Sequence, residues 1–96
     1  MGLSGITEKM RAEILRVTSL YGAVDVRIFG SVARGDATGN SDLDLLVRMK
    51  PGRSLLDIIA IKQDLEDLLG VPVDVVSEQA LSPYIREEVL SEAVAL

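Results

Sequence analysis

The sequence predicts an α/β protein of the α+β arrangement, with a mixed three-strand sheet flanked by helices in the order α-β-β-α-β-α. Three observations support this fold class. Apolar residues recur at helical spacing in three segments, β-rich runs lie between those segments, and glycines and prolines separate the two kinds of segment. A chain of 96 residues is the size of one domain, so we expect a single catalytic or binding domain over residues 1–96.

The first helix is predicted over residues 5–20. Its apolar positions are Met10, Ile14, Val17 and Tyr21, which follow one another at steps of four, three and four. Thr7 is suited to cap the start of this helix, and Gly22 to end it. We expect both tyrosines of the chain, Tyr21 and Tyr84, to be packing residues.

Two strands follow. Residues 24–29 are β-rich and partly alternate apolar with polar side chains, and the glycine-containing residues 30–41 connect them to a second strand. In that second strand the side chains divide between two faces: Leu43, Leu45 and Val47 on one, Asp42, Asp44 and Leu46 on the other. Pro51 and Gly52 then interrupt the chain.

The second half of the chain predicts a helix, a strand and a helix. Ser54 and Asp57 resemble a capping box that opens a helix ending at Gly70. Residues 72–76 form a third strand with Asp74 at its centre. Ser82 and Pro83 are suited to begin a last helix. One stripe of that helix carries Ile85, Val89, Ala93 and Leu96, and a second stripe, a candidate contact surface, carries Leu90 and Val94.

The order of these elements suggests how the strands pair. The second and third strands are joined through a helix, so we expect them to be parallel with a right-handed crossover. If the first two strands are antiparallel neighbours, Gly30 and Ser31 reach the end of the sheet at which Asp42, Asp44 and Asp74 lie.

Composition limits the chemistry. The chain has no cysteine and no histidine, so a general base must be a carboxylate and a metal site must be rich in oxygen, which favours magnesium or manganese over zinc. A net charge of −5 disfavours an extended nucleic-acid surface. No apolar run reaches the length of a membrane span and no signal peptide is evident, so we expect a cytoplasmic protein.

Asp42 and Asp44 are the central candidates. Residues two apart in a strand point to the same face, so the two carboxylates can together hold divalent metal ions against a phosphate chain. The plainer alternative is two turn or strand-edge residues, but a charge within so apolar a strand requires a partner or a metal. Asp74 is either a third metal ligand or the base that accepts a hydroxyl proton, with a solvent-facing residue of an edge strand as the alternative.

The glycine-containing connection is a candidate phosphate site. Residues 30–35 have the Gly-x-x-x-x-Gly spacing of a P-loop, but Asp36 and Ala37 stand where Lys and Ser/Thr would follow, so the Walker interpretation fails. Backbone N–H groups and the Ser31 hydroxyl can still bind phosphate oxygens, and Arg34 is either a charge for a leaving diphosphate or a surface residue.

A calcium loop can also be excluded. Residues 36–47 begin with oxygen side chains at alternate positions, as such a loop does. The sixth position is Ser41 rather than glycine, however, and the twelfth is Val47 rather than glutamate.

Residues 29–47, with the sequence FGSVARGDATGNSDLDLLV, resemble the signature of the DNA polymerase beta-like nucleotidyltransferases, and in particular the minimal nucleotidyltransferases (MNT). The resemblance extends over nearly the whole chain and implies a polymerase beta-like core that transfers a nucleoside monophosphate from an NTP. It implies that Asp42 and Asp44 bind two magnesium ions, that Asp74 completes one metal site, and that Gly30 and Ser31 hold the triphosphate with help from Arg34.

The resemblance also implies a partner. Minimal members commonly pair with a helical HEPN toxin and act as its antitoxin by adding AMP from ATP to a tyrosine of that toxin. An antitoxin that only occludes its partner, and a transferase acting on a small aminoglycoside-like molecule, stay open as alternatives. We expect a homo- or hetero-oligomer, since the second stripe of the last helix should be covered. The sequence identifies neither the acceptor nor the preferred base of the NTP.

Overall fold

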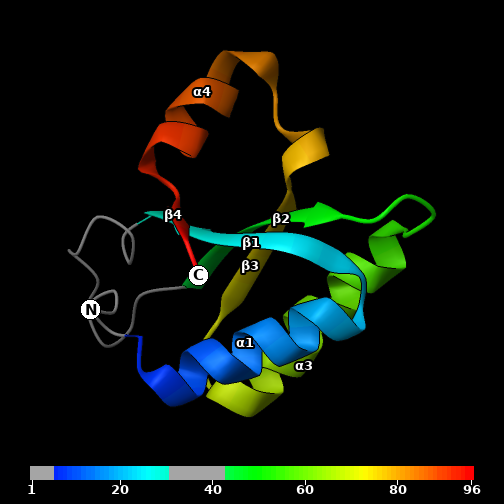
Figure 1. The fold of residues 1–96 in the computed structure, drawn as a ribbon, viewed down its shortest axis with the longest axis vertical. Helices are drawn as coiled ribbons and strands as arrows, with labels where there is room; N and C mark the ends of the chain where they lie inside the picture. Colours follow the sequence, from blue (N-terminus) through cyan, green and yellow to red (C-terminus); the bar gives the residue numbers. More distant parts are fainter. Residues whose placement is uncertain (1–5, 31–42) are drawn as a thin grey trace.

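The computed structural model describes residues 6–30 and 43–96, in which a four-stranded sheet has helices on both of its sides (Figure 1). The elements in chain order are α1 (Glu8–Leu20), β1 (Ala23–Phe29), β2 (Leu43–Met49), α3 (Leu55–Leu69), β3 (Val73–Ser77), the 3₁₀ helix η1 (Glu78–Ala80), α4 (Pro83–Glu92) and β4 (Val94–Ala95). The predicted fold class is therefore confirmed.

The strands lie in the order β3-β2-β1-β4. β2 and β3 are parallel, with α3 as their crossover, and β1 pairs antiparallel with β2. The parallel pairing was predicted from the order of the elements, and the antiparallel pairing is the one considered there as a hypothesis. They are the pairings that place the end of β1 beside the start of β2 and the start of β3.

The fourth strand corrects the sequence prediction. We predicted three strands and a last helix whose stripe continued to Ala93 and Leu96, but α4 ends at Glu92 and Ala93 is extended. β4 then pairs antiparallel with β1, and the Leu96 N–H donates to the Val26 carbonyl at 3.1 Å. The open edge of β1 offers backbone groups that need partners, and this tertiary pairing outweighs the helical periodicity of the segment.

The predicted helix caps are confirmed. Thr7 accepts a hydrogen bond from the Met10 N–H at 3.1 Å, and helix α1 begins at Glu8 rather than at residue 5. Ser54 and Asp57 form a complete capping box at the start of α3. Gly70 ends that helix in the left-handed conformation, with φ of 70°. Ser82 caps α4, and Pro83 is its first residue, as predicted.

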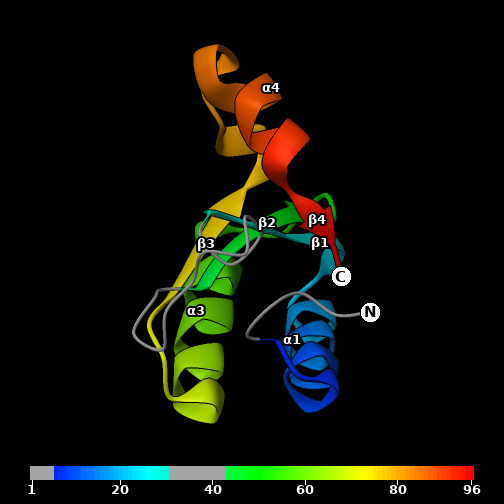
Figure 2. The same cartoon turned by 90° about the vertical axis from the view of Figure 1, so that its left-hand side faces the viewer.

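The hydrophobic core lies between one face of the sheet and the pair of helices α1 and α3, whereas α4 lies on the opposite side (Figure 2). The buried core residues are Ile14, Val17, Val26, Ile28, Leu43, Leu45, Val47, Ile61, Leu65 and Val73. The sheet face that carries Leu43, Leu45 and Val47 is thus the core face. The opposite face, here called the outer face, is left for Asp44 and Leu46.

Among the described residues, no helix has the length and apolar character that crossing a membrane would require. The expectation that the protein is cytoplasmic stays a prediction.

The two tyrosines differ in environment. Tyr21 packs against the core and its hydroxyl donates to Asp64 Oδ2 at 2.7 Å, so the expected packing role is confirmed for Tyr21. Tyr84 is 96% exposed on α4, so the expectation was wrong for Tyr84. No residue of α4 is buried, so this helix does not bring the Tyr84 ring into the interior of the protein.

Truncation of Leu65 should strongly destabilise the protein. Leu65 is fully buried between α3 and the sheet, and Leu65→Ala should lower the free energy of unfolding by about 2–5 kcal/mol. Leu56→Ala is the matched control on the same helix, because Leu56 is 76% exposed, and it should change stability by no more than about 0.5 kcal/mol. Urea unfolding followed by circular dichroism measures both values, and equal losses would contradict this core.

The Tyr21 hydroxyl should make stability depend on alkaline pH. Its hydrogen bond to Asp64, followed by partial burial and the negative charge of Asp64, raises the pKa of Tyr21 above its usual value of about 10. The stabilisation is therefore complete below about pH 10 and is lost as pH rises through the raised pKa of the folded state. Between pH 9 and pH 11 the urea midpoint of the wild type should fall more than that of Tyr21→Phe. Tyr84→Phe, the control, should follow the wild type.

Candidate functional site

The outer face of the sheet carries a row of three side chains from three strands. β1 ends with Phe29, which is paired in register with Asp44 of β2, and Asp44 is paired with Asp74 of β3. Paired residues of neighbouring strands point to the same face, and the core residues Val73 and Leu43 show that this face is the outer one. Two of the predicted site residues, Asp44 and Asp74, are thus neighbours in the sheet.

The pairing of Asp44 with Asp74 places two carboxylates side by side. Neighbouring strands are about 4.8 Å apart, and like charges directly opposite each other in a sheet are destabilising. Asp44 is half-buried, whereas Asp74 is exposed on the edge strand β3, as in the plainer alternative considered for it. That alternative gives no reason for the pairing of Asp74 with Asp44. A shared cation would give one, because it would offset the repulsion between the two carboxylates.

Gly30 lies directly against the Asp44 carboxylate. Its φ of +76° is in the left-handed region, so the chain leaves β1 through a conformation that favours glycine. A Cβ atom built on Gly30 would collide with Asp44 Oδ2. The predicted phosphate-loop glycine and the predicted metal ligand are therefore in contact, and glycine is the residue type that leaves room for the carboxylate.

Three predicted site residues, Ser31, Arg34 and Asp42, lie outside the described residues. Within residues 6–30 and 43–96, no three acidic side chains gather closely enough to hold a metal ion. The predicted cluster of three carboxylates needs Asp42, so the described part of the chain leaves the assignment of Asp42, Asp44 and Asp74 as metal ligands a prediction.

Sequence analysis missed Glu66, a carboxylate close to this row. Glu66 Oε2 accepts a hydrogen bond from the backbone N–H of Val73, the residue before Asp74. The only indication in the sequence is the i,i+4 spacing of Lys62 and Glu66 on α3. Arg53 and Asp57 have the same spacing without contacting a strand in their ion pair, so spacing alone does not identify the contact.

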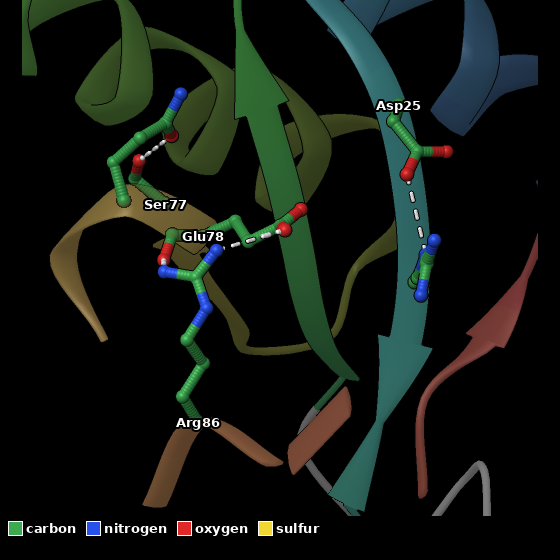
Figure 3. Close-up of polar contacts among 6 residues, drawn as sticks. Asp25, Ser77, Glu78 and Arg86 are labelled. Atoms are coloured by element: carbon green, nitrogen blue, oxygen red, sulfur yellow. Dashed lines mark hydrogen bonds and ion pairs between the residues drawn. The ribbon is translucent and has the colours of Figure 1, made fainter. Parts of the chain in front are cut away.

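Two further polar contacts lie on the outer face of the molecule. Arg86 of α4 donates to the Glu78 carbonyl and to Glu78 Oε1, both at 3.3 Å, which attaches α4 to η1 directly after β3 (Figure 3). On β1, Arg27 pairs with Asp25 at 3.2 Å. The structure thus gives each of these two arginines an acidic partner.

The arrangement suits the binding of a phosphate chain through cations. Half-buried and exposed carboxylate oxygens on one sheet face are ligands for hard divalent ions, and glycine at the adjacent turn lets the backbone approach a bulky anion. The described residues contain no cysteine or histidine with which to build a different kind of metal site. The sheet end at which Gly30, Asp44 and Asp74 meet is thus the candidate active site.

Comparison with known proteins identifies the family of this chain. The nucleotidyltransferase domain family matches residues 11–96. A candidate protein adenylyltransferase of Methanocaldococcus jannaschii is 36% identical over 86 residues, which cover 90% of this chain and 92% of the relative. Protein adenylyltransferase MntA of Thermococcus cleftensis is 40% identical over 74 residues, which cover 77% of this chain and 75% of the relative.

Solved structures show the same fold. A candidate minimal nucleotidyltransferase is 56% identical and superimposes with a TM-score of 0.79, covering 93% of this chain and 94% of its own. A chain from the structure of a tri-AMPylated Shewanella oneidensis HEPN toxin in complex with MNT antitoxin superimposes with a TM-score of 0.73 at 16% identity, over 94% of this chain and 71% of its own. From the family match and these relatives, this chain belongs to the nucleotidyltransferase domain family, as one of its minimal members, and is a nucleotidyltransferase enzyme.

Proposed function

We propose that this protein transfers AMP from ATP to a hydroxyl group of a partner protein, a tyrosine of a HEPN-type toxin, and so acts as an antitoxin. The observation that carries the proposal is the outer-face row in which Asp44 faces Asp74 and Gly30 lies against Asp44. This arrangement supports a site for a charged phosphate chain, because the sequence that resembles the nucleotidyltransferase signature includes Gly30 and Asp44.

The choice of AMP and of a protein acceptor is supported by the relatives. Two relatives at 36% and 40% identity are named as protein adenylyltransferases, one of them as a candidate. A structural neighbour of the same fold comes from a complex of an AMP-modified HEPN toxin with an MNT antitoxin. These names describe the relatives, and their transfer to this chain is the proposal.

The proposed step is a displacement at the α-phosphorus of ATP. The acceptor oxygen bonds to phosphorus, the bond to the bridging oxygen breaks, and diphosphate leaves. The proton of the hydroxyl passes to a carboxylate, for which Asp74 is suited because it is exposed at the strand edge. Gly30 and Ser31 would hold the triphosphate, and Arg34 would offset the charge of the departing diphosphate.

Asp42, Asp44 and Asp74 would hold two magnesium ions, or manganese in their place. Such ions, when bound, make the attacking oxygen more nucleophilic and stabilise the leaving oxygen. The described residues fit this role because the carboxylates of Asp44 and Asp74 share one face of the sheet and supply oxygen ligands. The half-burial of Asp44 limits its freedom to turn away from that face.

The exposed helix α4 supports the presence of a protein partner. Tyr84 and Ile85 are exposed apolar side chains on a helix of which no residue is buried, and α4 is on the same side of the sheet as the outer face (Figure 2). A macromolecular acceptor that reaches Asp44 and Asp74 would approach past this helix. A homo- or hetero-oligomer that covers α4 is part of the proposal.

Replacement of Asp44 should abolish transfer. The assay contains purified HEPN-type partner, magnesium and ATP labelled at the α-phosphate. Asp44→Asn should reduce labelling of the partner by more than about 100-fold, because loss of a residue that only hydrogen-bonds to a metal ligand already costs about 10–100-fold. Asp67→Asn, which removes an exposed carboxylate from α3 on the other side of the sheet, should label like the wild type. Circular dichroism would establish that each variant is folded.

The same variants separate the alternatives. An Asp44→Asn protein that no longer labels the toxin but still neutralises it would favour the occluding antitoxin over the enzyme. Label that appears only on an added aminoglycoside-like molecule would favour the small-molecule transferase. Equal labelling by wild type and Asp44→Asn would remove Asp44 from the mechanism.

Gly30→Ala should impair activity more than stability. Left-handed backbone costs a non-glycine residue about 1–2 kcal/mol, and the new methyl group would also push the Asp44 carboxylate out of place. Gly70→Ala is the matched control: Gly70 has a φ of +70° but open space around its Cβ position. Both variants should lose similar stability in urea, and only Gly30→Ala should lose labelling activity, by about tenfold or more. Equal activities would show that contact with Asp44 is unimportant.

A further inference from the structure

The free edge of β3 is occupied by side chains at one residue, Val73. β3 is an edge strand, so alternate backbone groups along it have no strand to pair with. The Leu43 N–H bonds to the Pro72 carbonyl at 3.0 Å, which directs the Pro72 carbonyl toward β2. The N–H and carbonyl groups of Val73 are instead bonded to side chains of α3, at the free edge and one residue before Asp74.

Lys62 and Glu66 hold both backbone groups of Val73. Glu66 Oε2 accepts from the Val73 N–H at 3.0 Å, and Lys62 Nζ donates to the Val73 carbonyl at 2.8 Å. Lys62 Nζ also donates to Glu66 Oε2 at 2.9 Å, which closes a ring of three contacts. Lys62 supplies a donor and Glu66 an acceptor, so together they satisfy the backbone groups of Val73 as a neighbouring strand would.

The ionised form of Glu66 suits this contact. The hydrogen bond from Val73, and next the one from Lys62, lowers the pKa of Glu66 below its usual value, so the carboxylate stays charged near neutral pH. Hydrogen bonds to ionised partners are about twice as strong as neutral ones. The contact therefore fixes the start of β3 more firmly than an ordinary edge contact with water.

We propose that Lys62 and Glu66 are positioning residues for the active site, which hold the Val73 peptide so that the next residue, Asp74, stays level with Asp44. The inference rests on the proposed metal-binding function of these two aspartates. β3 is short, and at this end it has a neighbouring strand on one side only. Without the side-chain pair, the two backbone groups of Val73 at the free edge would lose these partners, and the position of Asp74 relative to Asp44 would be less fixed.

The contact differs from the other ion pairs of α1 and α3. Arg16 and Glu13 on α1 form an equally short ion pair at 2.8 Å, and the Glu13 side chain is 32% exposed, close to the 33% of Glu66. Glu13 bonds to Arg16 on its own helix, whereas Glu66 and Lys62 each also bond to the backbone of a strand. Glu13 therefore provides a control with the same charge, exposure and kind of partner.

Binding of Mn²⁺ tests the inference without turnover. The full chain would be titrated with Mn²⁺ in the presence of a non-hydrolysable ATP analogue, with free Mn²⁺ measured by electron paramagnetic resonance. Glu66→Ala should weaken Mn²⁺ binding about tenfold, in the range that outer partners of metal sites contribute. Lys62→Met, a second variant should Glu66→Ala fold poorly, should weaken binding in the same direction. Glu13→Ala should bind Mn²⁺ like the wild type.

A conservative variant separates positioning from charge. Glu66→Gln keeps an oxygen that can accept from the Val73 N–H but removes the negative charge. If the hydrogen bond matters, Glu66→Gln should bind Mn²⁺ within about threefold of the wild type. Binding as weak as that of Glu66→Ala would instead assign the effect to charge and overturn the positioning role.

The remaining outcomes distinguish the inference from the function on which it rests. Asp44→Asn should lose Mn²⁺ binding. If it does, and Glu66→Ala binds like Glu13→Ala, the positioning inference is overturned and the proposed function stands. If wild type and Asp44→Asn bind Mn²⁺ equally, or neither binds it, the metal-binding function fails and the inference fails with it.

Discussion

The parallel pairing of β2 with β3 is the constraint on which the rest of the site depends. It sets Asp44 beside Asp74, and because strand side chains alternate, the same register directs Leu43 and Val73 into the core. A shift of one residue in either strand would place a carboxylate in the core and an apolar residue in the site. The energy of burial therefore holds the register that pairs the two candidate site residues, although both lie outside the core.

This division of the sheet suits a chain of 96 residues. One face is covered by α1 and α3 and carries the main hydrophobic core, while the outer face carries Asp44 and Asp74 beside the buried Leu46. A small domain can bury only one such core, so a second covered face would require more chain or a partner. The exposed α4 on the outer side is consistent with the second solution.

The sequence predicted the topology where local and tertiary preferences agree. The crossover helix implied the parallel pair. Thr7 and Ser54 begin their helices, and Gly70 ends one, as their residue types suggest. It did not predict β4, because two residues become a strand only through pairing with β1. Nor did it predict the role of Glu66, because an i,i+4 ion pair and a strand-edge contact look alike in sequence. Asp44, Asp74 and Gly30 were brought together as expected, whereas Asp42, Ser31 and Arg34 lie outside the described residues.

The course of the chain after β3 has a consequence for access. β3 and β4 are the two edges of the sheet. The segment between them, which consists of η1 and α4, passes on the outer side from one edge to the other (Figure 2). The contact of Arg86 with Glu78 attaches this segment near β3, and the hydrogen bond from Leu96 to Val26 attaches its other end at β4. A bulky molecule that bound the outer face would have to approach from beside this segment rather than from directly above. Movement of this segment would also displace both edge strands of the sheet at the same time.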